Sequence, residues 1–250
     1  MEIAKIQSVA DSNKIEGIVT TSVRMKELIN QKAHPQNRDE QEILGYRDVL
    51  NTIHESYEYI LISSNYILQL HRNLFKYSEK GIDGRYKNTQ NSIVGKDTNG
   101  HIIEIFKPLS PYETPAAIEQ ICNELNTALD RKEVDALLLI PIFIHDFLCI
   151  HPFNDGNGRM SRLLTTLLLY RQGYVIGKYI SLESKIEKTK DSYYASLEKS
   201  GIGWAENKDN PIPFIKYILK TILAAYIDFE ERVNYVEEKN AYDNPCEKSH

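Results

Sequence analysis

Cysteine is scarce in this sequence, which has three cysteines among 250 residues. An odd number of widely spaced cysteines argues against a disulfide framework and against a zinc site. The first residues also lack the apolar core, flanked by basic residues, of a secretory signal. A reducing compartment is therefore the default, and we expect a cytoplasmic location.

Long apolar runs and an excess of positive charge are missing as well. The longest apolar stretch, Val134 to Ile150, is interrupted by Pro141, His145 and Asp146, so it does not reach the span of a bilayer. The formal net charge is -5 and the pI is about 5.8, which gives no electrostatic case for nucleic-acid binding. We expect neither a membrane nor a nucleic acid among the partners.

What the sequence does contain is helical periodicity. Hydrophobic residues make up 42% and charged residues 26%, as is typical of soluble globular proteins. Apolar residues recur at spacings of three and four in several segments. The clearest such series are Ile43, Tyr46, Leu50, Ile53 and Tyr57, and Ile67, Leu70, Leu74 and Phe75. We predict an all-α fold with one small β-hairpin.

Cap and turn residues predict where the later helices begin and end. Thr114 and Pro115 suggest an N-cap followed by proline in the first turn, and Pro141 should kink a central buried helix or mark its late start. Further helices are expected at Gly156 to Gln172, near Leu182 to Lys199, and from Pro211 to about Glu238. The aromatic residues of the last two segments, such as Tyr193 and Tyr194, are interpreted as core.

We divide the chain into three parts. Residues 1–30 form an N-terminal segment, residues 31–237 the core with C-terminal helices, and residues 238–250 a polar tail that we expect to be frayed.

The most informative feature is a polar run of twelve residues, from His151 to Arg162, between two apolar stretches. Gly156 and Gly158 allow the backbone to turn tightly and to come close to a ligand. Their N–H groups, and the positive end of the helix that they open, suit an anion. This run therefore predicts a site for a phosphate-bearing ligand.

The side chains of the run supply the remaining parts of such a site. Asp155 offers hard oxygen ligands that suit Mg²⁺. Arg159 and Arg162 are three residues apart, so they share a helix face and can clamp a polyphosphate. His151 is a candidate general base, because its ordinary pKa lies near 6.5. Together these residues predict phosphoryl or nucleotidyl transfer.

The run resembles the signature of the Fic family, H-P-F-x-D-G-N-G-R-x-x-R, at every fixed position. The resemblance implies transfer of AMP from ATP to a Ser, Thr or Tyr hydroxyl of a protein, including this chain itself. His151 would deprotonate the hydroxyl, Asp155 would hold Mg²⁺, and pyrophosphate would leave. The nucleotide-binding residues would be Gly156, Asn157, Gly158, Arg159 and Arg162.

The resemblance also assigns the phosphates to particular side chains. Asn157 would assist at the α-phosphate, Arg159 would meet the β-phosphate, and Arg162 would meet the γ-phosphate. Gly156 and Gly158 favour AMP transfer over the kinase-like and phosphocholine-transferring branches of the family.

A weaker motif, Ser12 to Gly17, precedes the core. By itself, Ser12 followed by Glu16 is typical of a helix start with an acid in the first turn. The motif also resembles the inhibitory-helix pattern of the family, S/T-x-x-x-E-G/N, whose glutamate pairs with the second signature arginine, here Arg162. A carboxylate there would occupy the seat of the γ-phosphate and misalign ATP.

Two short strands are predicted at Lys87 to Val94 and His101 to Phe106, with the turn signal Asn99-Gly100 between them. One interpretation is a surface excursion whose apolar side packs on the core. In Fic proteins, however, a hairpin flap pairs with the target by strand addition. The candidate docking residues are then Ile93, Val94, Ile103 and Ile105.

The combined prediction is a protein adenylyltransferase that uses ATP and Mg²⁺ and is autoinhibited by Glu16. Its partners would be ATP and a protein with a hydroxyl side chain, and the resemblance also allows a homodimer. Two alternatives remain open. Glu16 could instead position a water that removes AMP from a modified protein, or the chain could be a regulatory module that binds nucleotide without turnover.

Overall fold

The computed structural model describes residues 2–78, 84–96 and 101–243. Over these ranges it is mainly helical with one two-stranded sheet, which confirms the predicted fold class. The first helices are α1 (Glu2–Ile15), α2 (Ser22–Ile29), α3 (Arg38–Ser56), α4 (Ser64–Leu74) and α5 (Thr114–Arg131). The later helices are α6 (Ala136–Ile150), α7 (Asn157–Arg171), α8 (Leu182–Lys188), α9 (Lys190–Gly201) and α10 (Ile212–Asp243).

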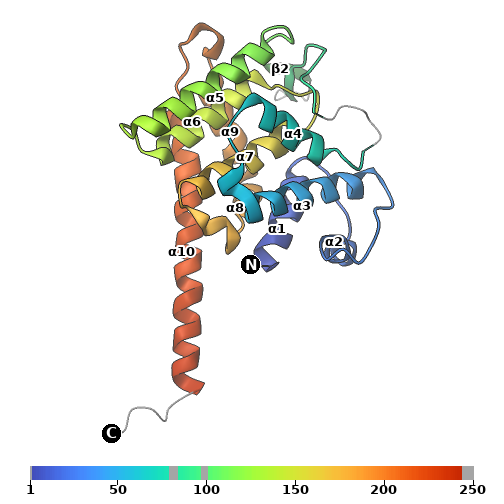
Figure 1. The fold of residues 1–250 in the computed structure, drawn as a ribbon, viewed down its shortest axis with the longest axis vertical. Coiled ribbons are helices and arrows are strands. Elements are labelled where there is room, and N and C mark those ends of the chain that lie inside the picture. Colours follow the sequence, from blue (N-terminus) through green and yellow to red (C-terminus); the bar gives the residue numbers. More distant parts are fainter. Residues whose placement is uncertain (1, 79–83, 97–100, 244–250) are drawn as a thin grey trace.

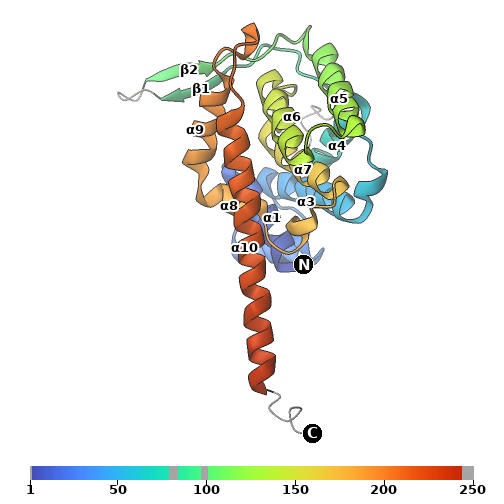
Figure 2. The same ribbon diagram turned by 90° about the vertical axis from the view of Figure 1, so that its left-hand side faces the viewer.

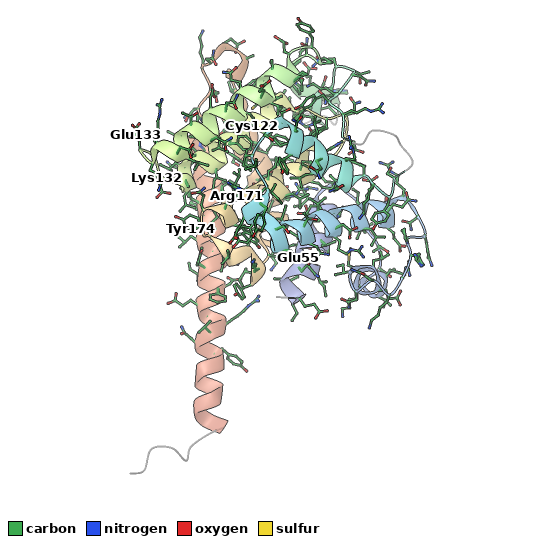
Figure 3. All side chains as sticks on the ribbon, in the orientation of Figure 1. Glu55, Cys122, Lys132, Glu133, Arg171 and Tyr174 are labelled. Atoms are coloured by element: carbon green, nitrogen blue, oxygen red, sulfur yellow. The ribbon has the colours of Figure 1, made fainter. Side chains whose placement is uncertain are left out.

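Helix α7 forms the centre of the molecule. Every residue from Arg159 to Tyr170 is buried, and the helix packs against α6, α3 and α1 (Figure 1). At its C-terminal end, Arg171 donates from Nη1 to the Ile60 carbonyl at 2.6 Å (Figure 3). Because α7 is enclosed on all sides, the polar side chains at its N-terminal end must find partners inside the protein.

Helix α6 leads directly into the signature run. Its N-cap is Asp135, whose side chain accepts from the Leu137 amide, and the helix continues through Pro141. The predicted central buried helix is therefore present and begins at Ala136. It ends at Ile150, and its C-cap is His151, whose left-handed φ of 51° turns the chain away from the helix axis.

The hairpin consists of β1 (Ile93–Lys96) and β2 (Ile102–Phe106), which pair antiparallel. The first strand begins later than predicted, at Ile93 instead of Lys87, because the residues before it bond to the loop after α6. The register shifts between Ile93 and Val94, so Ile105 is an extra residue in a β-bulge. The predicted turn at Asn99-Gly100 lies outside the described residues. Figure 2 shows the hairpin beside α9.

Three boundaries differ from the predictions. Thr114 is the first residue of α5 and Glu113 is the N-cap, since the Thr114 hydroxyl bonds to the Ser110 carbonyl instead. Two helices, α8 and α9, occupy Leu182–Gly201. Helix α10 continues to Asp243, so the chain stays helical over the first part of the predicted tail (Figures 1 and 2). Among the described residues no helix combines the length and apolar character needed to span a bilayer.

Candidate active site

His151 sits at the end of α6 with its ring fixed from one side. Its Nδ1 lies 3.3 Å from the Leu148 carbonyl oxygen. A carbonyl can only accept, so Nδ1 carries the proton and Nε2 has a free lone pair. Burial lowers the pKa of His151 to about 4, so the ring is neutral at physiological pH. A neutral imidazole in this tautomer is suited to act as a base.

The loop after His151 is shaped by Asn157. Its side-chain oxygen accepts from the Phe153 amide at 2.9 Å, and its nitrogen donates to the Phe153 carbonyl at 2.7 Å. Both ends of the Asn157 amide are thus used within the loop. In this structure Asn157 closes the loop, and the role at the α-phosphate that the resemblance implies for it stays a prediction.

Glycine is needed at two positions of the run for different structural reasons. Gly156 is the N-cap of α7 with a φ of 85°, and a Cβ there would lie 2.8 Å from the Phe75 ring. Gly158 faces the N-terminal motif instead: a Cβ there would lie 2.3 Å from Glu16 Oε1 and 3.2 Å from Arg162 Nη1. The first N–H groups of α7 have no intrahelical acceptor, so this end of the helix suits an anion.

Arg159 and Arg162 do not share one partner in this structure. Arg159 is fully buried, and its Nη1 lies 2.8 Å from Glu42 Oε2 of α3. Its Nη2 lies 3.3 Å from Asp155 Oδ1. The predicted paired clamp is therefore split, because the first arginine is engaged by carboxylates beside the loop.

Arg162 is bound by the N-terminal helix. Its Nη2 donates to Glu16 Oε1 at 2.7 Å, and Ser12 accepts at its hydroxyl from Nε (2.8 Å) and at its carbonyl from Nη2 (2.9 Å). The predicted pair of Glu16 and Arg162 is thus present. Burial opposes the charge of Arg162, but the charge of Glu16 raises the pKa of Arg162 above its ordinary value. The third nitrogen, Nη1, is buried and has no hydrogen-bond partner among the described residues.

The motif lies at the end of a helix, so the helix-start interpretation is wrong. Gly17, with a φ of 78°, donates to the Lys14 carbonyl, and Ile18 donates to the Asn13 carbonyl, both at 3.0 Å. These two bonds form a Schellman motif, in which glycine takes the left-handed position after the helix. Glu16 is the residue just before this glycine, so Gly17 sets the direction from which Glu16 reaches Arg162.

A buried chain of hydroxyl groups anchors the same helix. Ser8 of α1 donates to Ser181 Oγ at 3.0 Å, and Ser181 donates to Glu183 Oε2 at 3.3 Å. The Tyr46 hydroxyl of α3 donates to Glu183 Oε1 at 3.1 Å. Helices α1, α3 and α8 therefore meet in one polar network behind the helix that ends just before Glu16.

A cavity of about 650 Å³ connects these parts, a volume in the range of small-molecule sites. The α-helical side of its lining includes Glu16, His151, Gly158, Arg162, Tyr193 and Tyr194. Tyr193 is buried in the core as predicted and also lines the cavity, whereas Tyr194 is 43% exposed, so its assignment to the core is wrong. Asp155 and Arg159 are not part of this lining.

The hairpin closes one side of the cavity through Ile93, Val94 and Ile105. Val94 is 57% exposed and Ile105 is 41% exposed, so both present apolar surface to solvent. Gly95 makes room for this arrangement, because a Cβ there would lie 2.3 Å from Ile105 Cδ1. The backbone of Ile103 pairs with Gly95, while the side chain of Ile103 is outside the described part of the structure.

Two supporting residues were not predicted. His71 of α4 stacks on Phe153 with ring centroids 3.7 Å apart, and its Nε2 donates to the Asp155 carbonyl at 3.1 Å. Its position four residues after Ile67, on the apolar face of α4, was a usable signal for burial. Lys87 is also buried, and nothing in its polar sequence surroundings indicates this.

Asp155 is the hard oxygen donor of the loop. Its side chain is 36% exposed, with Oδ1 near Arg159 and Oδ2 3.7 Å from Arg38. The described residues contain no group of three or more His, Cys, Asp or Glu side chains that could hold a metal ion. One carboxylate is still compatible with Mg²⁺, which is often bound by one or two carboxylates together with substrate phosphates.

These features define a helical domain with an anion-binding loop at the start of a buried helix and a hairpin over the adjoining cavity. Residues 61–169 match the Fic/DOC family. This part of the chain is similar to Fic domains.

Known relatives agree with this assignment. The protein adenylyltransferase fic-1 of Caenorhabditis elegans is 29% identical over 188 residues, covering 73% of this chain and 32% of the relative. The protein adenylyltransferase Fic of Nematostella vectensis is 26% identical over 229 residues, covering 87% of this chain and 47% of the relative. The chain thus spans about a third to a half of the length of these relatives.

Solved structures share the fold. A Fic-domain-containing signaling protein from Bacteroides thetaiotaomicron has a TM-score of 0.71 at 24% identity, with 88% of this chain and 85% of that chain covered. A Fic family protein from Desulfovibrio desulfuricans has a TM-score of 0.73 at 22% identity, with 92% and 65% covered.

The role of Gly17 can be tested against an equivalent glycine. Gly173 ends α7 with the same pair of bonds and a φ of 86°, and neither glycine has an atom within 4 Å of its missing Cβ. Alanine at either position should therefore destabilise the protein by a similar amount, about 1 kcal/mol, through left-handed strain. Only Gly17→Ala should weaken the contact between Glu16 and Arg162. Thermal unfolding of both variants, together with the rate of the AMP transfer proposed below, checks this; equal rates would show that Gly17 does not orient Glu16.

Proposed function

We propose that this protein transfers AMP from ATP to a hydroxyl group of a protein. The observation that carries the proposal is the shared cavity, in which a neutral His151, the Gly158 end of α7 and the Arg162 guanidinium lie beside an exposed apolar hairpin. A base, an anion site and a peptide-docking surface are the three parts that such a transfer needs.

The base is Nε2 of His151. The hydroxyl oxygen of the target attacks the α-phosphorus while its proton passes to Nε2. The bond from the α-phosphorus to the bridging oxygen breaks, and pyrophosphate leaves with that electron pair. The Leu148 carbonyl keeps Nδ1 protonated, so the ring is oriented with its free lone pair away from the helix end.

The phosphates are expected at the start of α7. The N–H groups of its first turn and the helix dipole favour an anion there. Arg162 Nη1 supports the same position, because it is a buried donor next to Gly158 without a partner among the described residues. A phosphate oxygen would satisfy this donor, whose isolation otherwise costs free energy.

Mg²⁺ would be held by Asp155 together with the phosphates. When bound, the ion would neutralise negative charge that develops on the departing pyrophosphate. His71 contributes indirectly, because its bond to the Asp155 carbonyl fixes the backbone that presents this carboxylate.

Asp155→Asn tests the metal assignment. The substitution keeps the size of the side chain but removes the charge, so Mg²⁺ should no longer increase the affinity for ATP. Binding of ATP to both proteins, measured with Mg²⁺ and with a chelator, gives the result. An undiminished effect of Mg²⁺ in Asp155→Asn would refute the role of this carboxylate.

Glu16 is proposed as an inhibitor of this reaction. Its carboxylate already neutralises Arg162, and a γ-phosphate would have to compete for the same guanidinium. ATP that binds while Glu16 stays in place would be displaced from the alignment needed for attack, and an error of about 1 Å can cost roughly a hundredfold in rate.

The target is proposed to dock on the hairpin. A two-stranded sheet leaves an unpaired edge on each strand, and an extended segment can bind such an edge through backbone hydrogen bonds. The exposed side chains of Val94 and Ile105 would then contact the side chains that flank the modified hydroxyl.

A further inference from the structure

Lys87 is a buried cation outside the residues considered so far. Lys87 is only 3% exposed. The ammonium group donates from Nζ to the Ile150 carbonyl at 2.9 Å and to Asn91 Oδ1 at 3.1 Å. Lysine is almost never fully buried unless its charge is satisfied, so these two bonds account for its position.

The acceptor of one of these bonds, the Ile150 carbonyl, lies at the C-terminal end of α6. Ile150 is the last residue of α6, and its carbonyl belongs to the four that have no partner within the helix. A cation at this end of a helix is also favoured by the helix dipole. The peptide group that Lys87 binds is the one immediately before His151, so the lysine acts on the backbone that carries the proposed base.

The same short segment binds the next residues of the loop. The Lys87 amide donates to the Pro152 carbonyl at 2.8 Å, and the Asn91 side chain donates to the Phe153 carbonyl at 3.1 Å. Strand β1 begins just after this segment, at Ile93. Residues 87–91 therefore connect the loop that carries His151 to the start of the hairpin.

We propose that Lys87 is a positioning residue, which fixes the His151 loop against the base of the hairpin so that the histidine faces a hydroxyl docked there. This inference rests on the proposed function. Binding of the target on β1 or β2 and placement of the base would then depend on one shared segment.

Charge supports the assignment. Burial lowers the pKa of Lys87 to about 8, so the group is mostly protonated at neutral pH. Its charge helps to lower the pKa of His151, while the charge of Glu16 acts in the opposite direction. Among the described residues, Lys87 and Glu16 are the charged groups that shift the pKa of His151, so Lys87 is the one left in a Glu16→Gly background.

The test uses Glu16→Gly as the parent, with Lys87→Met, Lys87→Arg and Thr89→Val added to it. Methionine keeps an unbranched apolar stem without the charge, and arginine keeps a charged donor. Thr89→Val is the matched control, because Thr89 joins the same two segments through an exposed bond to Asn154 at 3.3 Å. We expect kcat to fall roughly tenfold to a hundredfold in Lys87→Met, with ATP affinity near the parent value, and to stay near the parent in Thr89→Val. Lys87→Arg should recover part of the loss.

A second readout distinguishes positioning from a general loss of structure. Without the positive charge of Lys87 the pKa of His151 should rise, so the acidic limb of the activity profile should move to higher pH. The imidazole signal of His151, titrated by NMR, reports the same pKa shift and does not depend on activity. If the Glu16→Gly parent transfers no AMP, the proposed function fails, but this titration still tests the role of Lys87. An unchanged His151 titration in a folded Lys87→Met protein would overturn the inference, as would a loss of kcat no larger than in Thr89→Val.

Discussion

Replacing Glu16 by glycine is expected to raise AMP transfer about a hundredfold. The reason is the 2.7 Å contact between Glu16 Oε1 and Arg162 Nη2, which occupies the guanidinium that a γ-phosphate would use. Ser12 keeps its two bonds to Arg162 in this variant, so the arginine should stay oriented when the carboxylate is gone. Initial rates of AMP incorporation at saturating ATP measure the gain.

Lys14→Ala is the control for a general loosening of α1. Lys14 forms an exposed ion pair with Glu187 of α8 at 2.7 Å, and such surface pairs contribute little to stability. It should leave the rate near that of the unmodified protein. If Lys14→Ala activated the enzyme as strongly as Glu16→Gly, release of the helix and not removal of the carboxylate would be the cause.

Arg162→Ala separates the inhibitor from its target site. This variant removes the contact with Glu16 as well as the proposed γ-phosphate ligand. It should therefore stay slow, unlike Glu16→Gly, and similar rates in the two variants would contradict the pairing as the basis of inhibition.

His151→Ala, made in the Glu16→Gly background, is expected to lower transfer by about 10² to 10⁴, the usual contribution of a general base. ATP affinity should stay close to that of the parent, because the base acts only in the chemical step. Single-turnover rates and ATP binding, measured on the same samples, check both statements. Transfer at the parent rate would eliminate His151 as the base.

The pH dependence follows from the same residue. In the proposed reaction His151 must be neutral, and burial lowers the pKa of its ring to about 4. The rate should therefore hold as pH falls from neutral and decline only as pH approaches 4, well below the ordinary value of about 6.5. Removal of Glu16 takes away a charge that raises this pKa, so Glu16→Gly should not move the limb to higher pH. A limb near pH 6.5 would show that the ring is solvated.

The helices around the signature could be predicted from sequence because apolar periodicity and capping residues act locally. Asn37 caps α3 through the Glu40 amide, and Gly173 ends α7. The start of β1 could not be predicted in the same way. Lys87 to Asn91 resembles a continuation of the strand, but its backbone and side chains are bonded to Ile150, Pro152 and Phe153, which are distant in sequence.

The part of the candidate site that could be predicted consists of side chains whose contacts follow from the sequence motif alone. His151, Glu16 and Arg162 line one cavity, and Glu16 contacts Arg162 as the resemblance implied; their roles in catalysis and inhibition stay predictions. The roles of Asn157 and Arg159 depend on partners that sequence spacing does not reveal, namely the Phe153 backbone and Glu42 of α3. Helical spacing puts two arginines on one face, but only packing decides which carboxylate each of them meets.

The most direct test of the proposed reaction is the fate of the phosphates of ATP with the Glu16→Gly protein. Label at the α-phosphate should become attached to the protein with release of pyrophosphate, while label at the γ-phosphate should not. Attachment of the γ-label would contradict AMP transfer and indicate a kinase reaction. Attachment of neither label, with a range of protein substrates and with ATP shown to bind, would contradict transfer and favour a nucleotide-binding role without turnover.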